Sequence, residues 1–242
     1  MSDQKFNIYG DVYIPTTGAH GANISQQRMD ALDIECLKYI DDLNRLYPDD
    51  PVRVVDLGGG SGQQSRRMAD HGAEVLLIDL TDQKRFIETI KPLHAKGKIG
   101  FVQSDVRSIP ESQWPNPIDC IYSQRALNYL TYSDCLELLI RLRGRSRERT
   151  RLFFSMGGVN AEYGADYSAR HTPIERRFGR LSPEMSAKHG IHAEICLYSQ
   201  DELNALVRAA GFIPERTWLS AFGSPKLILS LIHISEPTRP LY

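Results

Sequence analysis

The stretch that decides the fold reads Val54-Val55-Asp56-Leu57-Gly58-Gly59-Gly60-Ser61-Gly62. Two β-branched residues lead into an acid, and glycines then follow at every second position. This order predicts a buried strand, then a turn too tight for side chains, and then a helix. In such a turn, backbone N–H groups can approach a ligand closely at the start of the helix. We therefore expect a ligand-binding loop here, with further ligand contacts at the ends of other strands.

Length and composition describe an ordinary globular chain. Its 242 residues are enough for one well-buried domain with insertions, and 41% of them are hydrophobic and 24% charged. The net charge of −1 gives no global basic field that would indicate a nucleic-acid partner. The four cysteines are scattered without a Cys-x-x-Cys pair, which is typical of a reducing compartment. With no signal-peptide core and no apolar run of roughly eighteen residues, we expect a soluble cytoplasmic protein.

Strands and helices alternate along the predicted chain. Residues 1–50 should form an N-terminal arm and an amphipathic helix, because Met29, Leu32, Cys36 and Ile40 recur at three- or four-residue spacing. Strands are then expected at 54–57, 74–79, 98–103, 118–122, 150–155, 212–219 and 225–229, with helices between most of them. This alternation predicts an α/β fold with a mostly parallel sheet and helices on both faces. Residues 157–198 are too many for a simple connection, so we expect a lid or substrate insertion after the fifth strand.

The spacing of the glycines separates the ligands that such a loop could hold. A phosphate-binding P-loop needs Lys-Ser/Thr after its last glycine, and a dinucleotide-binding loop needs glycine at the position of Gln63. Neither pattern is met. Asp79 ends the next strand and Asp105 follows the third, where a carboxylate can take a ribose diol and another acid can accept from an exocyclic amine. The pattern indicates a nucleoside whose other end is not a pyrophosphate, although both acids could instead only cap the following helices.

This constellation resembles motif I and the following motifs of the class I S-adenosylmethionine-dependent methyltransferases, over roughly residues 50–229. The resemblance implies a Rossmann-like, doubly wound sheet of seven strands in the order 3-2-1-4-5-7-6, the last strand antiparallel, with S-adenosylmethionine as cofactor. It implies that Asp79 holds the ribose hydroxyls, that Asp105 holds the adenine amine, and that Asp56 orients the loop and the amino group. The cofactor-binding residues implied in this way are Asp56, Gly58, Gly60, Gly62, Asp79, Asp105, Val106 and Ser123.

The methyl acceptor is less well defined, because transfer from a sulfonium chiefly needs proximity and alignment. A general base is required only if the nucleophile must lose a proton. We expect the N-terminal arm, residues 124–129 and the insertion to converge at the carboxyl ends of the strands. The candidates there are Tyr13, His20, Arg125, Asn128, Tyr167 and Arg170 for the substrate, with Tyr129 and the possible base His171 for catalysis. In the insertion, Arg170 is the candidate carboxylate anchor, while His171 could equally be a solvated surface histidine. The histidines are too irregularly spaced to predict a metal site.

An arginine run between a predicted helix and the fifth strand is the densest basic feature: Arg141, Arg143, Arg145, Arg147, Arg149 and Arg151. It could bind a phosphate backbone. Its position, opposite the ligand loop and after a helix C-terminus, favours a solvated basic loop instead.

We therefore expect residues 51–229 to form an S-adenosylmethionine-dependent methyltransferase domain that acts on a small molecule, without a metal and without a membrane partner. Residues 124–129 resemble the segment after strand 4 in small-molecule methyltransferases, and they lack the Asn/Asp-Pro-Pro-Tyr/Phe motif of enzymes that methylate amino groups of DNA and protein. The alternatives are an RNA or protein methyltransferase with the same cofactor and a non-catalytic nucleotide-binding protein of the same fold. We expect residues 230–242 to be non-native, because they are similar to translated vector or adaptor read-through.

Overall fold

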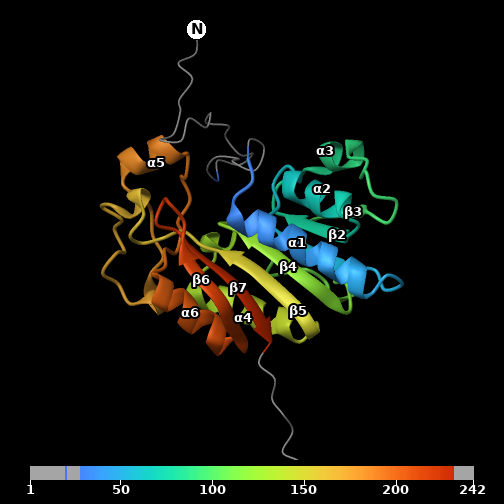
Figure 1. Ribbon diagram of the computed structural model, residues 1–242. Helices are drawn as coiled ribbons and strands as arrows, with labels where there is room; N and C mark the ends of the chain where they lie inside the picture. The colour runs from blue at the N-terminus through green and yellow to red at the C-terminus, as the bar shows by residue number, and fades with distance from the viewer. Residues whose placement is uncertain (1–19, 21–27, 232–242) are drawn as a thin grey trace, which may run out of the picture.

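The computed structural model of the chain describes residue 20 and residues 28–231 (Figure 1). One sheet contains the strands β1 (Arg53–Leu57), β2 (Glu74–Asp79), β3 (Lys98–Gln103), β4 (Ile118–Gln124), β5 (Ser146–Ser155), β6 (Phe212–Leu219) and β7 (Pro225–Leu231). Its order is β3-β2-β1-β4-β5-β7-β6, and β7 runs antiparallel to both neighbours while the other neighbouring pairs are parallel. The predicted Rossmann-like fold, with its strand order and its reversed strand, is confirmed.

The helices of the described part are α1 (Ala31–Leu46), α2 (Gln63–Asp70), α3 (Lys84–Thr89), α4 (Tyr132–Arg143), α5 (Pro183–His189) and α6 (Gln200–Ala209), with short 3-10 helices η2 (Glu111–Gln113), η3 (Leu127–Tyr129), η4 (Glu162–Gly164) and η5 (Ile174–Arg176). None of the helices within residues 28–231 combines the length and the apolar character needed to cross a membrane.

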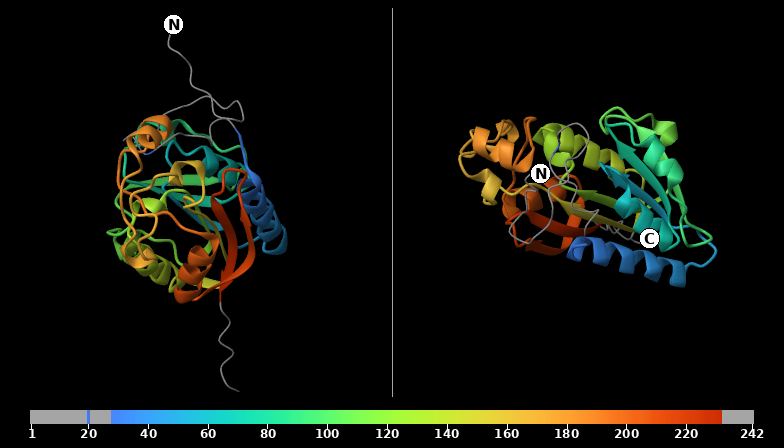
Figure 2. Two further views of the ribbon diagram at one scale, coloured as in Figure 1. Left: turned by 90° about the vertical axis from the view of Figure 1, so that its left-hand side faces the viewer. Right: turned by 90° about the horizontal axis from the view of Figure 1, so that it is seen from above.

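Two apolar cores lie on the two faces of the sheet, because neighbouring side chains of a strand point in opposite directions. Val54 packs with the buried residues of α1 and α2, whereas Val55 packs with those of α4 and α6. Seen from above, α1 and α4 cover opposite faces of the sheet (Figure 2). The doubly wound arrangement leaves the carboxyl ends of β1, β2 and β4 at one edge.

The insertion between β5 and α6 has a small apolar core of its own, although its sequence is polar. Val159, Tyr163, Tyr167, Ile195 and Leu197 are buried together in this cluster. The cluster consists of tyrosines and a few aliphatic residues that are far apart in the segment. The sequence therefore shows no local periodicity that would predict this core. Residues 157–198, expected from their length to be a lid or substrate insertion, therefore also pack around apolar side chains of their own.

The predicted solvated basic loop is wrong. Strand β5 begins at Ser146, not near residue 150, so Arg147, Arg149 and Arg151 lie in the strand. Arg147 and Arg149 both form ion pairs with Asp119, whose side chain is fully buried, and with Asp50. Arg147 and Arg149 are thus engaged in internal ion pairs at the amino edge of the sheet.

The last strand is longer than predicted. Strand β7 continues to Leu231, two residues into the segment expected to be non-native. Ser230 pairs with Ile213 and Leu231 with Phe212 in the ladder with β6.

Candidate functional site

The glycine loop after β1 has a backbone that only glycine adopts readily. Gly58, Gly60 and Gly62 have φ values of 69°, 54° and 78°. The Gly58 N–H donates to the carbonyl of Ile78 at 2.7 Å, and a Cβ at Gly58 would lie 2.2 Å from the Cβ of Ala126. A Cβ at Gly60 would meet no atom within 4 Å. The loop is packed on both flanks and open at its middle glycine.

Asp56 lies beneath this loop and braces it. Its side chain is 1% exposed, and Oδ2 accepts a hydrogen bond from the Ser65 hydroxyl at 2.5 Å. Burial raises the pKa of Asp56 to about 7, against the lowering effect of Ser65 and with a smaller raising effect from Asp79. The same Oδ2 would lie 2.7 Å from a Cβ at Gly59, so loop and carboxyl fit tightly.

Asp79 ends β2 and ties that strand to the middle of the loop. Its Oδ2 accepts from the Gly60 N–H at 2.9 Å, and its Oδ1 accepts from the N–H and the hydroxyl of Thr81 at 2.9 and 2.7 Å. The carboxylate is half-buried at the position where a ribose diol was predicted.

Asp105 follows β3 and is engaged by an arginine that sequence reasoning missed. The Arg107 guanidinium donates to both carboxylate oxygens, with Nε at 3.0 Å from each. These hydrogen bonds hold the pKa of Asp105 below its usual range. An adenine amine would have to share this carboxylate with Arg107. The neighbouring Val106 packs against the core on the α4 side of the sheet.

Ser123, near the end of β4, is fully buried and supports the loop from below. Its hydroxyl donates to the carbonyl of Leu57 at 3.2 Å, at the last residue of β1.

The segment after β4 lies directly against the glycine loop. Arg125 is exposed and has a φ of 56°, a left-handed conformation that is rare for a residue with a side chain. Its N–H donates to the carbonyl of Ser155 at 2.8 Å, which fixes the ends of β4 and β5 together. The contact of the next residue, Ala126, with Gly58 places this segment beside the loop.

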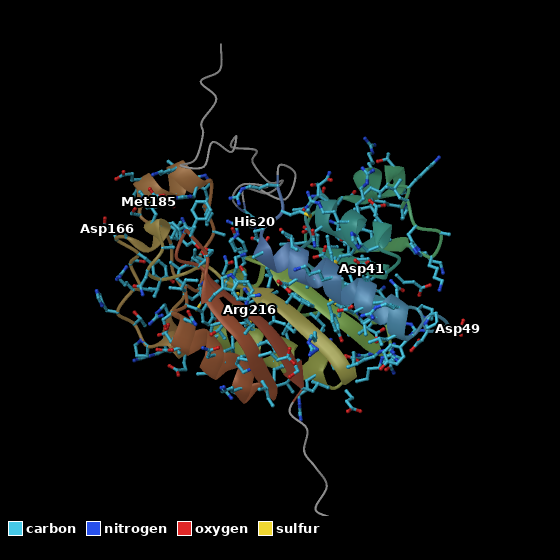
Figure 3. The ribbon with its side chains drawn as sticks, viewed as in Figure 1. His20, Asp41, Asp49, Asp166, Met185 and Arg216 are labelled. Atoms are coloured by element: carbon cyan, nitrogen blue, oxygen red, sulfur yellow. The ribbon has the colours of Figure 1, made fainter. Side chains whose placement is uncertain are left out.

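Three parts of the chain meet around Tyr129, namely the arm at His20, the segment after β4 and the insertion. The His20 ring packs edge-on against Tyr129 with centroids 4.8 Å apart, and the His20 backbone bridges to Ile191 in the insertion. Figure 3 shows His20 at the upper end of the molecule, where β4 and β5 end. Asn128 is 4% exposed and its carbonyl accepts from the N–H of Cys196, while its side-chain Oδ1 has no hydrogen-bond partner among the described residues.

Two predicted substrate residues instead hold the insertion together. Tyr167 is 3% exposed and donates from its hydroxyl to the carbonyl of Ile195 at 2.5 Å. Arg170 donates to the carbonyls of Val159 and Gly164, both at 2.9 Å. The structure does not bring the Arg170 guanidinium to the segment after β4.

The predicted base, His171, is exposed, and within residues 28–231 its side chain makes no hydrogen bond. The other predicted residue of the arm, Tyr13, lies outside the described residues. Sequence reasoning missed His189, the last residue of α5, whose ring packs edge-on against Tyr163 and whose Nε2 lies 3.5 Å from a carboxylate oxygen of Glu162. Burial lowers the pKa of His189, with Glu162 opposing that effect.

A buried polar cluster at the same edge was also missed. Lys226, in β7, forms an ion pair with Asp30 at 2.6 Å, and the side chains are 7% and 28% exposed. Asp30 also accepts from the Gln124 amide, and the neighbouring Asp33 accepts from the hydroxyl of Tyr122. A charge inside the apolar run of β7 is the signal that could have revealed it. Within the described residues, no group of His, Cys, Asp and Glu could hold a metal ion.

Comparison with known proteins gives one family match. A family model described as "Methyltransferase domain" matches residues 31–215. No curated protein matches the sequence.

Solved structures share the fold at low identity. An S-adenosylmethionine-dependent methyltransferase from Methanosarcina mazei is 18% identical with a TM-score of 0.59, covering 78% of this chain and 97% of that one. A Burkholderia thailandensis 1,6-didemethyltoxoflavin-N1-methyltransferase, solved with 1,6-didemethyltoxoflavin and S-adenosylhomocysteine, is 14% identical with a TM-score of 0.55, covering 82% and 79%. The pyocyanin biosynthetic protein PhzM is 17% identical with a TM-score of 0.52 and covers 80% of this chain, which spans about half (54%) of PhzM.

Proposed function

Because this chain belongs to the class I S-adenosylmethionine-dependent methyltransferase family, we propose that it transfers a methyl group from S-adenosylmethionine to a small-molecule acceptor. The observation that carries the proposal is the loop of three left-handed glycines joined to Asp79 through the Gly60 N–H. When bound, the cofactor supplies an electrophilic methyl group on a sulfonium. The protein has to bind and align the two reactants.

The residues at the carboxyl ends of β1 and β2 fit this cofactor. The open space at Gly60 lets a ligand approach the backbone, and the half-buried carboxylate of Asp79 lies next to it. Gly58, Gly60 and Gly62 would line the methionine and ribose, and Asp79 would accept from the ribose hydroxyls.

The remaining cofactor residues act beside or beneath that contact. Asp105 and Val106 would hold the adenine, with Arg107 fixing the orientation of the Asp105 carboxylate. Asp56 and Ser123 would support the loop close to the methionine part, since both are buried below it.

The acceptor would lie between the segment after β4 and the insertion of residues 157–198. Support comes from the packing of Tyr129 on the apolar cluster of the insertion and from the contact of His20 with both. A site built from three separate segments suits a compact molecule. The Burkholderia thailandensis enzyme, which has the same fold, acts on such a molecule.

Isothermal titration of the full chain with S-adenosylhomocysteine tests the cofactor half. We expect S-adenosylhomocysteine to bind. If the folded protein shows no detectable binding at millimolar S-adenosylhomocysteine, the proposed function is wrong. Production of S-adenosylhomocysteine from S-adenosylmethionine in the presence of an acceptor tests the catalytic half.

Asp79→Ala should weaken S-adenosylhomocysteine binding by about 1.5–3 kcal/mol, the range for hydrogen bonds to a charged group. Asp82→Ala is the matched control, because Asp82 is an exposed acid after the same strand. Thermal unfolding of both variants shows whether loss of the hydrogen bond from the Gly60 N–H to Asp79 has destabilised the protein, as distinct from loss of the ligand contact. Equal affinity of Asp79→Ala and wild type would place the ribose contact elsewhere.

A further inference from the structure

Arg125, in the segment after β4, is a cation beside the glycine loop. Its side chain is exposed at the carboxyl end of β4, and none of the carboxylates in the described part of the chain forms an ion pair with it. Its φ of 56° is held by the hydrogen bond from its N–H to Ser155. Such a conformation persists only where the surrounding structure enforces it, and it is concentrated at ligand sites.

Two nearby basic groups each lie beside an acid, and His189 shares its acid with Lys188. Lys226 is paired with Asp30, and His189 lies beside Glu162. Burial lowers the pKa of Lys226 and of His189, and in both cases the charge of Arg125 adds to the lowering. Arg125 is therefore close to both groups, and unlike them it forms no ion pair within residues 28–231.

A second observation points to a ligand in the same segment. Asn128, three residues after Arg125, is 4% exposed, and its Oδ1 lacks a partner among the described residues. A buried acceptor without a donor is costly, and a donor group on a bound molecule would satisfy it. Arg125 and Asn128 therefore lie on either side of Ala126 in the sequence, and Ala126 is the residue in contact with Gly58 of the loop.

We propose that the methyl acceptor is an anionic molecule whose carboxylate or phosphate group binds the Arg125 guanidinium. The planar guanidinium fork matches both groups bidentately. This assignment rests on the proposed function, since it names the class of acceptor for that same site. It moves the anion contact away from Arg170, whose guanidinium donates to carbonyls inside the insertion.

Titration calorimetry on the full chain, with and without S-adenosylhomocysteine, tests the assignment with benzoate, phenyl phosphate and the neutral benzamide as probes. We expect at least one anion to bind and benzamide not to bind, and the tighter anion distinguishes carboxylate from phosphate. Arg125→Gln should weaken anion binding about ten-fold or more. Glutamine has a Cβ like arginine, so the backbone strain at this position is unchanged.

Two further variants serve as controls. Arg208→Gln removes an exposed arginine in the last turn of α6 and should leave anion binding unchanged. Arg125→Lys keeps the charge without the fork and should give an intermediate affinity. Equal binding of benzoate and benzamide, no anion binding by wild type at millimolar probe, or wild-type affinity in Arg125→Gln would overturn the assignment. Failure of S-adenosylhomocysteine to bind would count against the proposed function, while the titration without it still reports on Arg125.

Discussion

The three left-handed glycines of the loop have the same backbone conformation but different surroundings. Gly58 is pressed against Ala126, whereas Gly60 has open space where a side chain would begin. An alanine at either position would have the same backbone strain. Comparing the two alanine variants therefore separates the effect of strain from the effects of steric crowding at Gly58 and of ligand contact at Gly60.

Gly58→Ala should therefore lower the free energy of unfolding by about 2–5 kcal/mol, from left-handed strain plus overpacking. Gly60→Ala should cost only about 1–2 kcal/mol, the strain alone. Its methyl group would project into the space proposed for the cofactor, so S-adenosylhomocysteine binding should fall more than stability does. Urea unfolding and titration calorimetry measure the two effects. Equal losses of stability would contradict the difference in packing.

Asp56 makes stability depend on pH in a way that can be assigned to one side chain. Burial raises its pKa in the folded protein to about 7 from an ordinary 3.8. Between these two values the folded state thus binds more protons than the unfolded state. The contribution of the protonated Asp56 carboxyl to the free energy of unfolding is complete below about pH 4 and is lost as the pH rises through 7.

The difference in unfolding free energy between wild type and Asp56→Asn should therefore change with a slope of up to about 1.4 kcal/mol per pH unit between pH 4 and 7. Relative to the variant, wild type becomes less stable as the pH rises. Urea unfolding at several pH values measures this difference, in which the other titrating groups cancel. Parallel profiles would show that the pKa of Asp56 in the folded protein stays near its ordinary 3.8.

Among the elements, the insertion is joined to α6 through a buried arginine, Arg177. Arg177 is 7% exposed, pairs with Glu202 through two hydrogen bonds of 2.7 and 2.8 Å, and donates to the carbonyls of Thr172 and Leu197. Glu202 also closes the capping box at the start of α6 with Ser199. The same ion pair therefore joins the insertion to the helix that follows it.

Arg177→Met should destabilise the protein by about 3 kcal/mol, because it leaves a partly buried carboxylate without its cation. Hydrogen exchange should increase first in residues 157–198. Lys188→Met is the control, since its pair with Glu162 is about half exposed on both sides and should be worth less than about 1 kcal/mol. Uniform exchange across the chain would mean that the insertion does not open separately.

Across the molecule, ion pairs join neighbouring segments at the amino edge of the sheet, whereas the proposed ligand site lies at the carboxyl edge. Arg147 and Arg149 converge on the buried Asp119 and on Asp50, joining β5 to β4 and to the turn before β1. An arginine run committed to such pairs is poorly placed to bind a nucleic acid, which would have to compete with carboxylates for each guanidinium.

The double variant Arg147→Met/Arg149→Met should lose about 3 kcal/mol of stability, because Asp119 would be buried without a cation. Arg141→Met/Arg145→Met should lose less than about 1 kcal/mol, since their partner Glu111 is 65% exposed. Neither variant should alter association with RNA, measured over a range of salt. A salt-dependent RNA affinity that disappears in the first variant would restore RNA as the candidate acceptor.

Local pattern was enough to predict the α/β fold class and the glycine loop after the first strand. Alternating apolar runs fix strands through the two-residue repeat of side-chain direction, and Gly58, Gly60 and Gly62 mark a backbone that other residues resist. The resemblance carried by Asp79 and Asp105 supplied the strand order. The strands and the glycine loop depend on neighbouring residues in the chain, so they can be predicted from the sequence.

The partners of the charged side chains were decided only by the tertiary structure. Arg170 was expected at a substrate and donates to carbonyls of its own insertion, while Lys226, in a strand read as apolar, meets Asp30 from the start of α1. A long charged side chain can reach any acid or carbonyl within several ångströms, and which one it meets depends on how distant segments pack. The sequence therefore locates the glycine loop that we propose holds the methyl donor, and packing determines that Arg125 forms no ion pair with the carboxylates of residues 28–231.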